Sequence, residues 1–366
     1  MAGSSFGTIF RITTWGESHG PSIGVVVDGC PAGLNLSEQD IQKQLDLRRP
    51  GQSQYSTPRN EADKVHILSG VFEGRTTGTS IALEVFNETQ RSKDYSDIAH
   101  NYRPGHADYT FDKKYGFRDY RGGGRSSGRE TIGRVAAGAI ALRFLASLGI
   151  DVTAYAASIG PVCAQSYDPL EINNNPFHLP DADAAKKAKE YADSMIEDKD
   201  SAGGVIECRI CGVPAGLGDP VFEKLDANLS KALMSIGAVK GIEIGDGFLV
   251  SHARGSENND SFYIDEDGNV CKKTNHAGGI LGGISDGDMI IVRAAVKPTP
   301  SIFRPQQSVS DKLEPVEMTI KGRHDPLIVP RAVVVVQSMC ALTIADSLLL
   351  NMSARMDKIL DFYNRK

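Results

Sequence analysis

The hexapeptide Gly29-Cys30-Pro31-Ala32-Gly33-Leu34 returns later in the chain as Gly212-Val213-Pro214-Ala215-Gly216-Leu217. In both places, apolar residues at helical spacing follow it. Five further positions match at one constant offset, namely Gly70, Gly74, Gly78, Ile81 and Leu83 with Gly279, Gly283, Gly287, Ile290 and Val292. A repeat this regular predicts an internal duplication, with units at about residues 1–150 and 200–366.

Pairs of predicted strands alternate with single predicted helices in both units. Strand patterns lie at residues 8–13, 23–28, 65–72, 79–86, 205–211 and 289–296. Helix patterns follow the Ser37 and Asp40 capping pair, run over residues 132–148, begin at Asp219 and Pro220, and run over residues 332–350. This order favours antiparallel sheets with helices packed against them over a doubly wound parallel sheet. Two such halves can bury their helices together.

Length and composition are those of a soluble globular protein. The chain has 366 residues, of which 40% are hydrophobic and 23% are charged, and this length alone allows one or two domains. The N-terminus lacks a signal-peptide pattern, and no apolar run reaches the ~18 residues of a membrane span. The net charge of −6 argues against a nucleic-acid partner. We expect a cytoplasmic enzyme that binds neither nucleic acid nor membrane.

Among the six cysteines, only Cys208-x-x-Cys211 has motif spacing. It lies in a strand pattern, in which residues i and i+3 point to opposite faces, so the two thiols cannot easily share a metal ion. We expect reduced thiols and strand packing here. No other cluster has metal-ligand spacing, and we predict no metal.

Residues 118–131 combine four arginines with four glycines and lead into an apolar helix pattern. Glycine lets the backbone approach a ligand, arginine binds phosphate or carboxylate, and a helix N-terminus favours an anion. The stretch therefore predicts an anion site. A phosphate-binding Walker loop is excluded, because Arg129 and Glu130 stand where that motif has Lys and Ser/Thr. A solvated arginine-rich turn remains the alternative.

Two of the eight histidines lie on glycine-punctuated loops beside charged residues. His19 follows Glu17 and Ser18, and His106 stands within Arg-Pro-Gly-His-Ala-Asp. Histidine readily moves protons near neutral pH, so both are candidate acid–base groups. A surface or capping histidine is the alternative for each. We expect structural roles for His66, His100, His178 and His252.

Three further segments complete the candidates. Lys297, Pro298, Thr299, Pro300 and Ser301 form a stiff donor cluster that suits a phosphate or a flavin edge, with a plain stiff turn as the alternative. Asp325 stands near the start of the last helix and either acts chemically or caps that helix. Residues 181–199 predict an exposed charged helix between the two units, without chemistry. Residues 278–283 are not a dinucleotide fingerprint.

Four motifs resemble the chorismate synthase family, over the chain from near its N-terminus to beyond Asp325. They are Gly-Glu-Ser-His-Gly at 16–20 with Asp-Gly at 28–29, Arg-Pro-Gly-His-Ala-Asp at 103–108, the glycine and arginine stretch at 120–131, and Gly-Arg-His-Asp-Pro at 322–326. The resemblance implies one α+β domain over residues 1–366, with helices sandwiched between two antiparallel sheets, an internal pseudo-twofold repeat and a homotetrameric assembly.

The resemblance also implies a reaction. Members of the family are lyases that convert 5-enolpyruvylshikimate 3-phosphate to chorismate by anti 1,4-elimination of phosphate, the last common step of the shikimate pathway to aromatic amino acids. They require reduced FMN without net redox change. The sequence contains no obvious reductase domain, so we expect a monofunctional, bacterial-type enzyme that depends on NADPH only through an external flavin reductase.

Roles carried over by the resemblance fall on individual residues of this chain. The catalytic residues are His19, which protonates the departing phosphate, His106, which protonates reduced flavin, and Ser18 and Asp325, which assist. The FMN-binding residues are Arg125, Ser126, Ser127, Gly237, Ala238, Gly282, Lys297, Pro298, Thr299, Pro300, Ser301 and Arg323. Because arginine binds anions, we expect the phosphate and two carboxylates of the substrate to be bound by Arg48, Arg49, Arg103, Arg129 and Arg134.

Two positions depart from the family pattern. Gln54 replaces a basic residue, and Gly237 replaces an asparagine that some relatives have. Two other readings compete with an active enzyme: a flavin or anion-binding protein without turnover, and a phosphotransferase that uses the glycine loop. Intact His19, His106 and Asp325 argue against the first, and the missing Walker lysine argues against the second.

Overall fold

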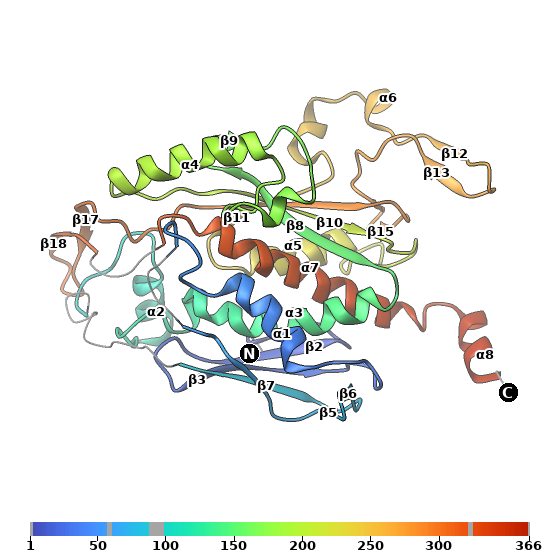
Figure 1. Cartoon of the computed structure of the whole chain (residues 1–366), viewed down its shortest axis with the longest axis horizontal. Helices are drawn as coiled ribbons and strands as arrows, with labels where there is room; N and C mark the ends of the chain where they lie inside the picture. The colour runs from blue at the N-terminus through green and yellow to red at the C-terminus, as the bar shows by residue number, and fades with distance from the viewer. Residues whose placement is uncertain (1–2, 57–60, 88–98, 321–324, 365–366) are drawn as a thin grey trace.

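Two five-stranded antiparallel sheets enclose a layer of helices in the computed structural model, which describes residues 3–56, 61–87, 99–320 and 325–364 (Figure 1). The first sheet contains, in spatial order, β1 (Ser5–Phe6), β2 (Arg11–Gly16), β3 (Ser22–Asp28), β7 (Ile81–Phe86) and β4 (Val65–Ile67). The second contains β9 (Val162–Cys163), β8 (Asp151–Ile159), β10 (Gly204–Cys211), β16 (Ile290–Val296) and β11 (Val239–Ile244).

Between the sheets lie α1 (Glu38–Arg48), α3 (Thr131–Ala146), α5 (Leu225–Met234) and α7 (Val329–Asn351) (Figure 1). The long helices α3 and α7 pack along each other at the centre, with α1 beside the first sheet and α5 beside the second. This arrangement confirms the predicted α+β fold with helices between antiparallel sheets. The two sheets also have corresponding strand orders, which is what a duplication predicts.

Matched hairpins carry the same hydrogen bonds in the two halves. The β5 (Val71–Phe72) and β6 (Arg75–Thr76) hairpin meets the first hexapeptide, where the Thr76 hydroxyl donates to the Pro31 carbonyl at 2.6 Å and accepts from the Leu34 amide at 2.9 Å. The hairpin of β14 (Ile280–Leu281) and β15 (Ile284–Ser285) places Ser285 on the second hexapeptide with the same two bonds, at 2.7 and 2.9 Å. These bonds support our proposal of two related units.

Three predicted element boundaries are wrong. The first long strand begins at Arg11 rather than Thr8, because the Asp346 carboxylate of α7 binds the amides of residues 8, 9 and 10 at 2.7–2.9 Å. The pattern at 65–72 is two strands, β4 and β5, separated by a bend. The helix expected from Asp219 begins at Leu225, and Phe222 lies outside it and is 90% exposed.

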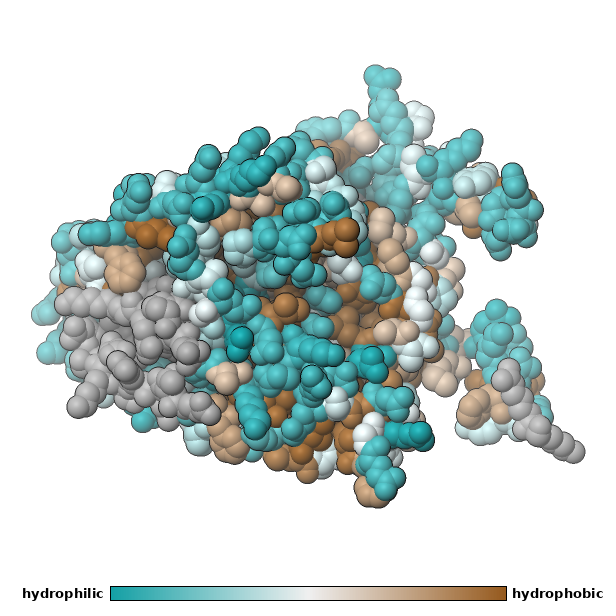
Figure 2. Space-filling view, in the orientation of Figure 1, coloured by the Kyte–Doolittle hydropathy of each residue, from teal (hydrophilic) through white to brown (hydrophobic). Residues whose placement is uncertain are grey.

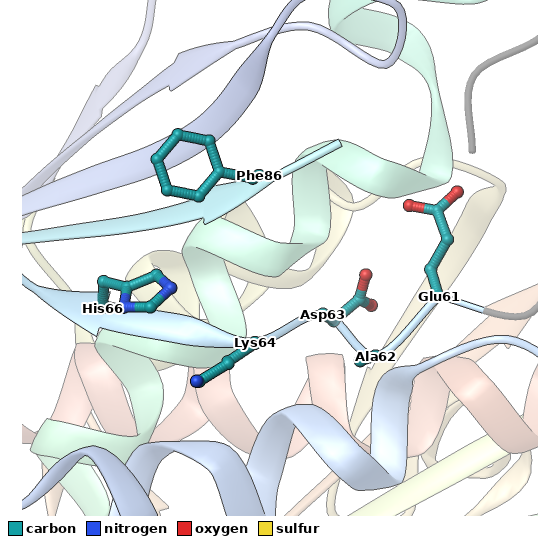
Figure 3. A pocket seen from close by; sticks show the side chains of 6 residues that line it. All are labelled: Glu61, Ala62, Asp63, Lys64, His66 and Phe86. Atoms are coloured by element: carbon teal, nitrogen blue, oxygen red, sulfur yellow. The ribbon is translucent and has the colours of Figure 1, made fainter. Parts of the chain in front are cut away.

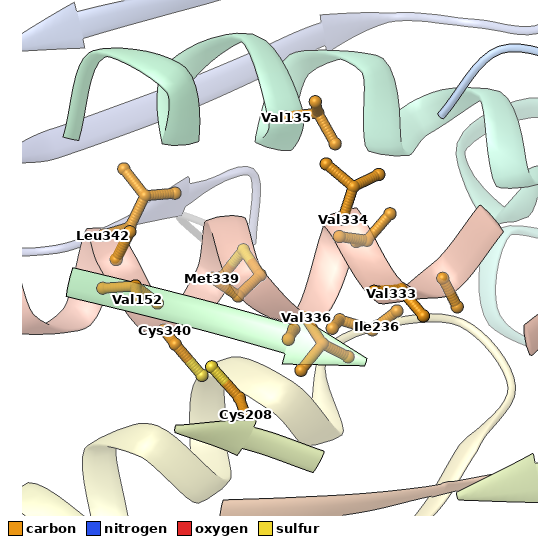
Figure 4. Close-up of a cluster of buried hydrophobic side chains, with 14 of the residues drawn as sticks. Val135, Val152, Cys208, Ile236, Val333, Val334, Val336, Met339, Cys340 and Leu342 are labelled. Atoms are coloured by element: carbon orange, nitrogen blue, oxygen red, sulfur yellow. The ribbon is translucent and has the colours of Figure 1, made fainter. Parts of the chain in front are cut away.

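The centre of the helix layer is almost wholly aliphatic (Figure 4). Val135 of α3 faces Val334 of α7, and the thiols of Cys208 and Cys340 point toward each other (Figure 4). A hydrogen bond with Cys340, together with burial, raises the pKa of Cys208. Cys208 is buried and Cys211 exposed, which confirms that their side chains lie on opposite faces of the strand.

One helix of the described residues, α7, is long and apolar enough to cross a membrane by length and composition, with a mean hydropathy of 2.0. It is not the unbroken apolar run that the sequence expectation excludes, because Arg331, Gln337 and Asp346 interrupt it. The most apolar stretch of α7 is 72% buried inside the protein, because this helix packs between the two sheets. The buried surroundings are those of a core helix.

The remaining elements lie around this body. The predicted charged helix is α4 (Ala182–Glu197), which packs Ala184, Ala188 and Ala192 inward and is therefore only partly exposed. The peripheral strands and short helix are β12 (Phe262–Ile264), β13 (Val270–Lys272), β17 (Gln306–Val309), β18 (Pro315–Met318) and α6 (Gly255–Asn258). The C-terminal α8 (Met356–Asn364) stands clear of the main body, with hydrophobic and hydrophilic residues mixed on its surface (Figure 2).

Candidate active site

His19 lies on the turn between β2 and β3, against the glycine and arginine stretch. Its Nδ1 is 3.1 Å from the hydroxyl of Ser18, which is buried. A Cβ atom on Gly122 would overlap the His19 ring, so a larger residue there must displace the imidazole. The structure thus brings together two predicted features, the His19 turn and the loop at 118–131.

His106 lies against the proline-flanked segment at 297–301. Its Nε2 is 2.7 Å from the hydroxyl of Ser301, a buried residue 195 positions away in sequence. The Lys297 ammonium donates to the Gly105 carbonyl at 2.9 Å, which fixes the loop from the other side. Gly105 has a φ of 71°, a conformation that glycine adopts without strain. The helix that follows, α2 (Asp108–Tyr115), was not predicted.

Two of the arginines expected to bind substrate share one buried carboxylate. Asp63 accepts from Arg48 Nη1 at 2.6 Å and from Arg129 Nη1 at 3.1 Å. Arg48 also donates to the Thr131 hydroxyl at 3.1 Å, at the start of α3. Burial is the main cause that lowers the pKa of Arg48 to about 10, so the guanidinium stays charged at neutral pH. Asp63 therefore holds two cations together beneath the loop at 118–131.

A second carboxylate reinforces this cluster. Glu61 forms an ion pair with Arg129 at 2.7 Å, and its side chain lies beside Asp63 while Lys64 points away (Figure 3). Glu61, Asp63 and His66 line a cavity of about 40 Å³, which is enough for a water molecule but not for a substrate. His66 packs edge-on against Phe86 at 5.8 Å, as expected of a structural histidine.

Asp325 joins the same cluster through Arg331. Its carboxylate accepts from Arg331 Nη1 at 2.6 Å, and Arg331 Nε donates to the Arg48 carbonyl at 3.1 Å. The alternative role of Asp325 as a helix cap is wrong, because the N-cap of α7 is Ile328 and no side chain of the described residues caps it. Residues just after Asp325 pair with Ala202, next to Ser201, whose hydroxyl donates to the Thr299 carbonyl at 2.6 Å. The Asp325 and His106 segments are therefore connected.

The other arginines assigned to substrate differ in their surroundings. Arg103 forms a buried bidentate ion pair with Asp108, with both bonds at 2.7 Å. Although burial alone would raise the pKa of Asp108, the bonds and charge of Arg103 lower it. Arg134 binds Glu130 at 2.8 Å and the Ser235 hydroxyl at 2.6 Å. Arg49 has 45% of its side chain exposed, and among the residues that the structure describes its guanidinium has one distant partner, Asp46 at 3.7 Å.

Of the residues expected to bind flavin, those on the glycine and arginine stretch lie at the end of β2. Arg125 donates to the Thr14 hydroxyl at 2.6 Å and to the Gly16 carbonyl at 3.1 Å. The Ser126 hydroxyl donates to the Gly123 carbonyl at 2.6 Å, and the Ser127 hydroxyl accepts from the Arg129 amide at 3.3 Å. Arg125 and the two serines thus border the turn that carries His19.

A second flavin segment also has the chemistry that a phosphate-bearing cofactor needs. The Lys297 amide donates to the Ala238 carbonyl at 2.9 Å, which places Gly237 and Ala238 beside residues 297–301. No atom of the described residues lies within 4 Å of a Cβ built on Gly237, so space is open there within that part of the chain. The buried hydroxyl of Thr299 has no hydrogen-bond partner among the described residues. A cation, an orphan hydroxyl and open space together fit reduced FMN.

One expected flavin ligand, Gly282, is not brought to this place within one chain. Gly282 lies in the exposed turn between β14 and β15, before the start of β16, whereas Lys297 follows the end of that strand. A strand of 7 residues spans about 20 Å, so Gly282 is remote from Lys297 within one chain. Arg323 lies outside the described residues. Among the residues that the structure describes, no group of three His, Cys, Asp or Glu side chains can hold a metal ion.

The partner residues that hold these groups were not identified from the sequence. In the sequence, nothing distinguishes Asp63, Asn87 and Arg331 from ordinary polar residues. Only the folded chain brings them next to Arg48 and Arg129. Gln54, one of the departures from the family pattern, donates to the Tyr55 hydroxyl at 2.8 Å. Tyr55 in turn donates to Asp193 of α4 at 2.9 Å, so Gln54 takes part in a link to that helix.

Comparison with known proteins identifies the family. The chorismate synthase family model matches residues 10–349. Chorismate synthases of Lachnospira eligens and Agathobacter rectalis are each 64% identical over the full length of both chains. The chorismate synthase of Chloroflexus aggregans is 55% identical over 97% of this chain and 98% of its own length. A crystal structure of chorismate synthase aligns with a TM-score of 0.76 and 30% identity, over 98% of this chain and 97% of its own.

The predicted fold and family are thereby confirmed, and they carry a lyase activity, a small-molecule substrate and a flavin cofactor in general terms. The chain belongs to the chorismate synthase family.

Proposed function

We propose that this protein converts 5-enolpyruvylshikimate 3-phosphate to chorismate by anti 1,4-elimination, with reduced FMN and without net redox change. The reaction is the last common step toward the aromatic amino acids. Phosphate leaves with the electron pair of its C–O bond, and a ring hydrogen is lost as the new double bond forms. The observation that carries the proposal is a contact chain that joins the His19 turn, the Arg129, Asp63 and Arg48 cluster and Asp325.

His19 protonates the departing phosphate in this proposal. Ser18 orients the ring through its 3.1 Å contact with Nδ1 and assists in proton movement. Positioned proton donors accelerate such steps by ~10²–10⁴-fold. Arg48, Arg49, Arg103, Arg129 and Arg134 supply positive charge for the phosphate and carboxylates. Because Arg48, Arg103 and Arg129 are held by carboxylates, they act as a fixed electrostatic framework, and exposed Arg49 is the more mobile contact.

Bound reduced FMN would supply electron density for the loss of phosphate and would help to take up the ring hydrogen. Arg125, Ser126 and Ser127 on one side, and Gly237, Ala238 and residues 297–301 on the other, would hold it, together with Arg323. Gly282, which is remote from Lys297 within one chain, would reach the flavin from another copy in the proposed tetramer. His106 would provide a proton to reduced flavin bound there, since its ring is fixed by the 2.7 Å contact to Ser301. Asp325 assists proton movement from its place beside Arg331.

We also propose a cytoplasmic, monofunctional homotetramer of one domain per chain that obtains reduced flavin from an external NADPH-dependent reductase. The two units at about residues 1–150 and 200–366 are part of this proposal. If oxidised FMN and NADPH alone supported turnover, the external reductase would be unnecessary and this part would be wrong.

An anaerobic assay tests the function. Purified protein is mixed with 5-enolpyruvylshikimate 3-phosphate and chemically reduced FMN, and chorismate, phosphate and the flavin spectrum are followed together. We expect equal amounts of chorismate and phosphate with the flavin still reduced at the end. Tight flavin binding without product would identify a protein that has kept the pocket but lost turnover. Full turnover by His106→Ala would overturn the role of His106.

A further inference from the structure

Asn87 follows the last residue of β7 and connects two parts of the candidate site. Its Nδ2 donates to the carbonyls of Glu17 at 3.0 Å and Gly20 at 2.8 Å, and its backbone amide donates to the Pro21 carbonyl at 2.9 Å. The two side-chain bonds enclose Ser18 and His19 in sequence. A single amide group therefore holds both ends of the turn that carries His19.

The other end of the same amide binds an arginine. Asn87 Oδ1 accepts from Arg129 Nε at 3.0 Å and from Arg129 Nη2 at 2.7 Å. The orientation of the amide follows from its partners, because a guanidinium only donates and carbonyls only accept. The remaining Nη1 of Arg129 is held by Glu61 at 2.7 Å and Asp63 at 3.1 Å. Arg129 is thus fixed on two sides. Because Asn87 also binds the His19 turn, it fixes that turn relative to Arg129.

We propose that Asn87 is a positioning residue for the elimination, which sets His19 at a constant place relative to Arg129. The inference rests on the proposed function, in which His19 is the proton donor. No other side-chain type of this size offers two donors and two acceptor sites at once. Aspartate keeps the acceptor for Arg129 but turns both donors into acceptors that face carbonyls. Alanine removes both sets of bonds.

The test compares Asn87→Asp and Asn87→Ala with a matched control, Asn175→Asp. Asn175 also bridges two carbonyls, those of Glu171 at 2.7 Å and Leu179 at 2.8 Å, in the segment before α4. For both Asn87 variants we expect kcat to fall about 100-fold with little change in KM, since small misplacement of a catalytic group costs about that much. The pH profile of kcat should also shift, because the surroundings of His19 change. The control should keep the wild-type kcat and pH profile.

A second readout does not depend on turnover. With ¹³C-labelled histidine, the His19 resonance is assigned by its loss in His19→Gln and compared among the variants. We expect it to move in both Asn87 variants and to stay in place in Asn175→Asp, whereas His106 keeps its position throughout. An unmoved His19 resonance, or an Asn87→Asp variant with wild-type kcat, overturns the inference. Wild-type protein that makes no chorismate but has a His19 resonance sensitive to Asn87 would instead contradict the proposed function alone.

Folding of the variants is checked by near-ultraviolet circular dichroism. If one Asn87 variant loses the wild-type spectrum, the other carries the test. If both do, slow exchange of the Asn87 side-chain amide protons in wild-type protein decides it, since both protons are hydrogen bonded here. Rapid exchange of these protons would contradict the assigned contacts.

Discussion

Gly122 determines where the His19 ring can lie. A methyl group at this position would overlap Nδ1 and Cε1 of His19 and approach the Ser18 hydroxyl at 3.1 Å. The nearest atoms belong to the end of a side chain, so the ring can rotate away at low cost in stability. We therefore expect Gly122→Ala to lower kcat by about 100-fold, since catalysis depends on the position of the ring. The melting temperature should change little.

Gly255→Ala is the matched control for this prediction. No atom lies within 4 Å of a Cβ built on Gly255, which lies in the peripheral helix α6. Steady-state assays and thermal melts compare kcat and the melting temperature of the two variants. Wild-type kcat in Gly122→Ala would mean that the His19 ring has no required position.

Residue types and their local pattern predicted the two candidate catalytic histidines and the loop at 118–131. They did not predict which residues position these groups. His106 depends on Ser301, and Asp325 on Arg331 and, through it, on the Arg48 carbonyl. Such contacts arise between distant parts of the chain, and a sequence pattern contains no signal for them. Charge alone also assigned Arg103 to substrate, whereas the structure places it in a buried ion pair with Asp108, only five residues away.

The close crossing of α3 and α7 depends on Gly138. A Cβ at this position would come within 2.7 Å of the Cα of Ser338 on α7, so the helices themselves must move apart. Alanine normally stabilises a helix interior by about 1 kcal/mol relative to glycine, but overpacking costs about 1–3 kcal/mol. We expect Gly138→Ala to lower the free energy of unfolding by about 1–2 kcal/mol, measured by urea denaturation.

A double variant separates overpacking from other causes. Ser338→Gly removes the side chain that meets the new methyl group, so Gly138→Ala with Ser338→Gly should recover part of the loss. A double-mutant cycle measures this recovery as a coupling energy between the two positions. Purely additive effects would show that the two helices are not in contact at this crossing.

Asp181 caps α4 and makes the stability of that helix depend on pH. Its carboxylate accepts from the amides of Asp183, Ala184, Gln165 and Ser166, and these bonds, that of Ala184 first, lower its pKa to about 2. Because the folded pKa lies below the unfolded value of about 3.9, the contribution is present above pH ~4 and is lost as the pH falls toward 2. At pH 7, Asp181→Ala should cost about 1–2 kcal/mol.

The measurement is the free energy of unfolding of both proteins from pH 7 down to the acid limit. The difference between wild type and Asp181→Ala should shrink below pH ~4. Asp181→Asn keeps a capping oxygen but no charge. Its free energy of unfolding should fall less than that of Asp181→Ala, and its difference from Asp181→Ala should not depend on pH in this range. A difference that stays constant at every pH would mean that the carboxylate is not charged in the cap.

Helices with local signals were predictable, and those that depend on tertiary partners were not. The Ser37 and Asp40 capping box is confirmed at the start of α1. By contrast, α2 has only 8 residues and no side-chain cap, so its sequence gives little sign of a helix. The late start of β2 follows from Asp346, a residue more than 330 positions away that binds the preceding amides.

The internal repeat of the whole molecule could be predicted from the sequence because several of its matched positions are glycines that adopt positive φ. Gly70 and Gly279 both have φ of 81°, and Gly74 and Gly283 have 75° and 86°. Other residue types adopt this conformation at a cost, which ties these glycines to the two matched hairpins. Segments without a counterpart interrupt the repeat. One of them carries α4, which was predicted as a helix between the two units, whereas the β12 and β13 hairpin was not predicted from the sequence.

The surface of α8 bears on the expected tetramer. This helix projects from the body of the molecule, and Met356, Leu360, Phe362 and Tyr363 are 48–78% exposed (Figure 1). An isolated helix of 9 residues is marginal in water, so a partner that covers its apolar side chains would stabilise it. A second copy of the chain provides such a partner if the protein is a tetramer. Leu360→Glu with Phe362→Glu should then weaken assembly without unfolding the body.

Light scattering after size-exclusion chromatography gives the mass of each assembly. Wild-type protein should have four times the 39.4 kDa chain mass, and the double α8 variant a smaller multiple with an unchanged circular dichroism spectrum. Phe222→Glu is the control, because Phe222 is 90% exposed on a different segment. A wild-type mass of one chain would contradict the tetramer itself. A tetramer in the α8 variant would instead place the contacts between copies elsewhere, because two buried charges on α8 would each oppose association.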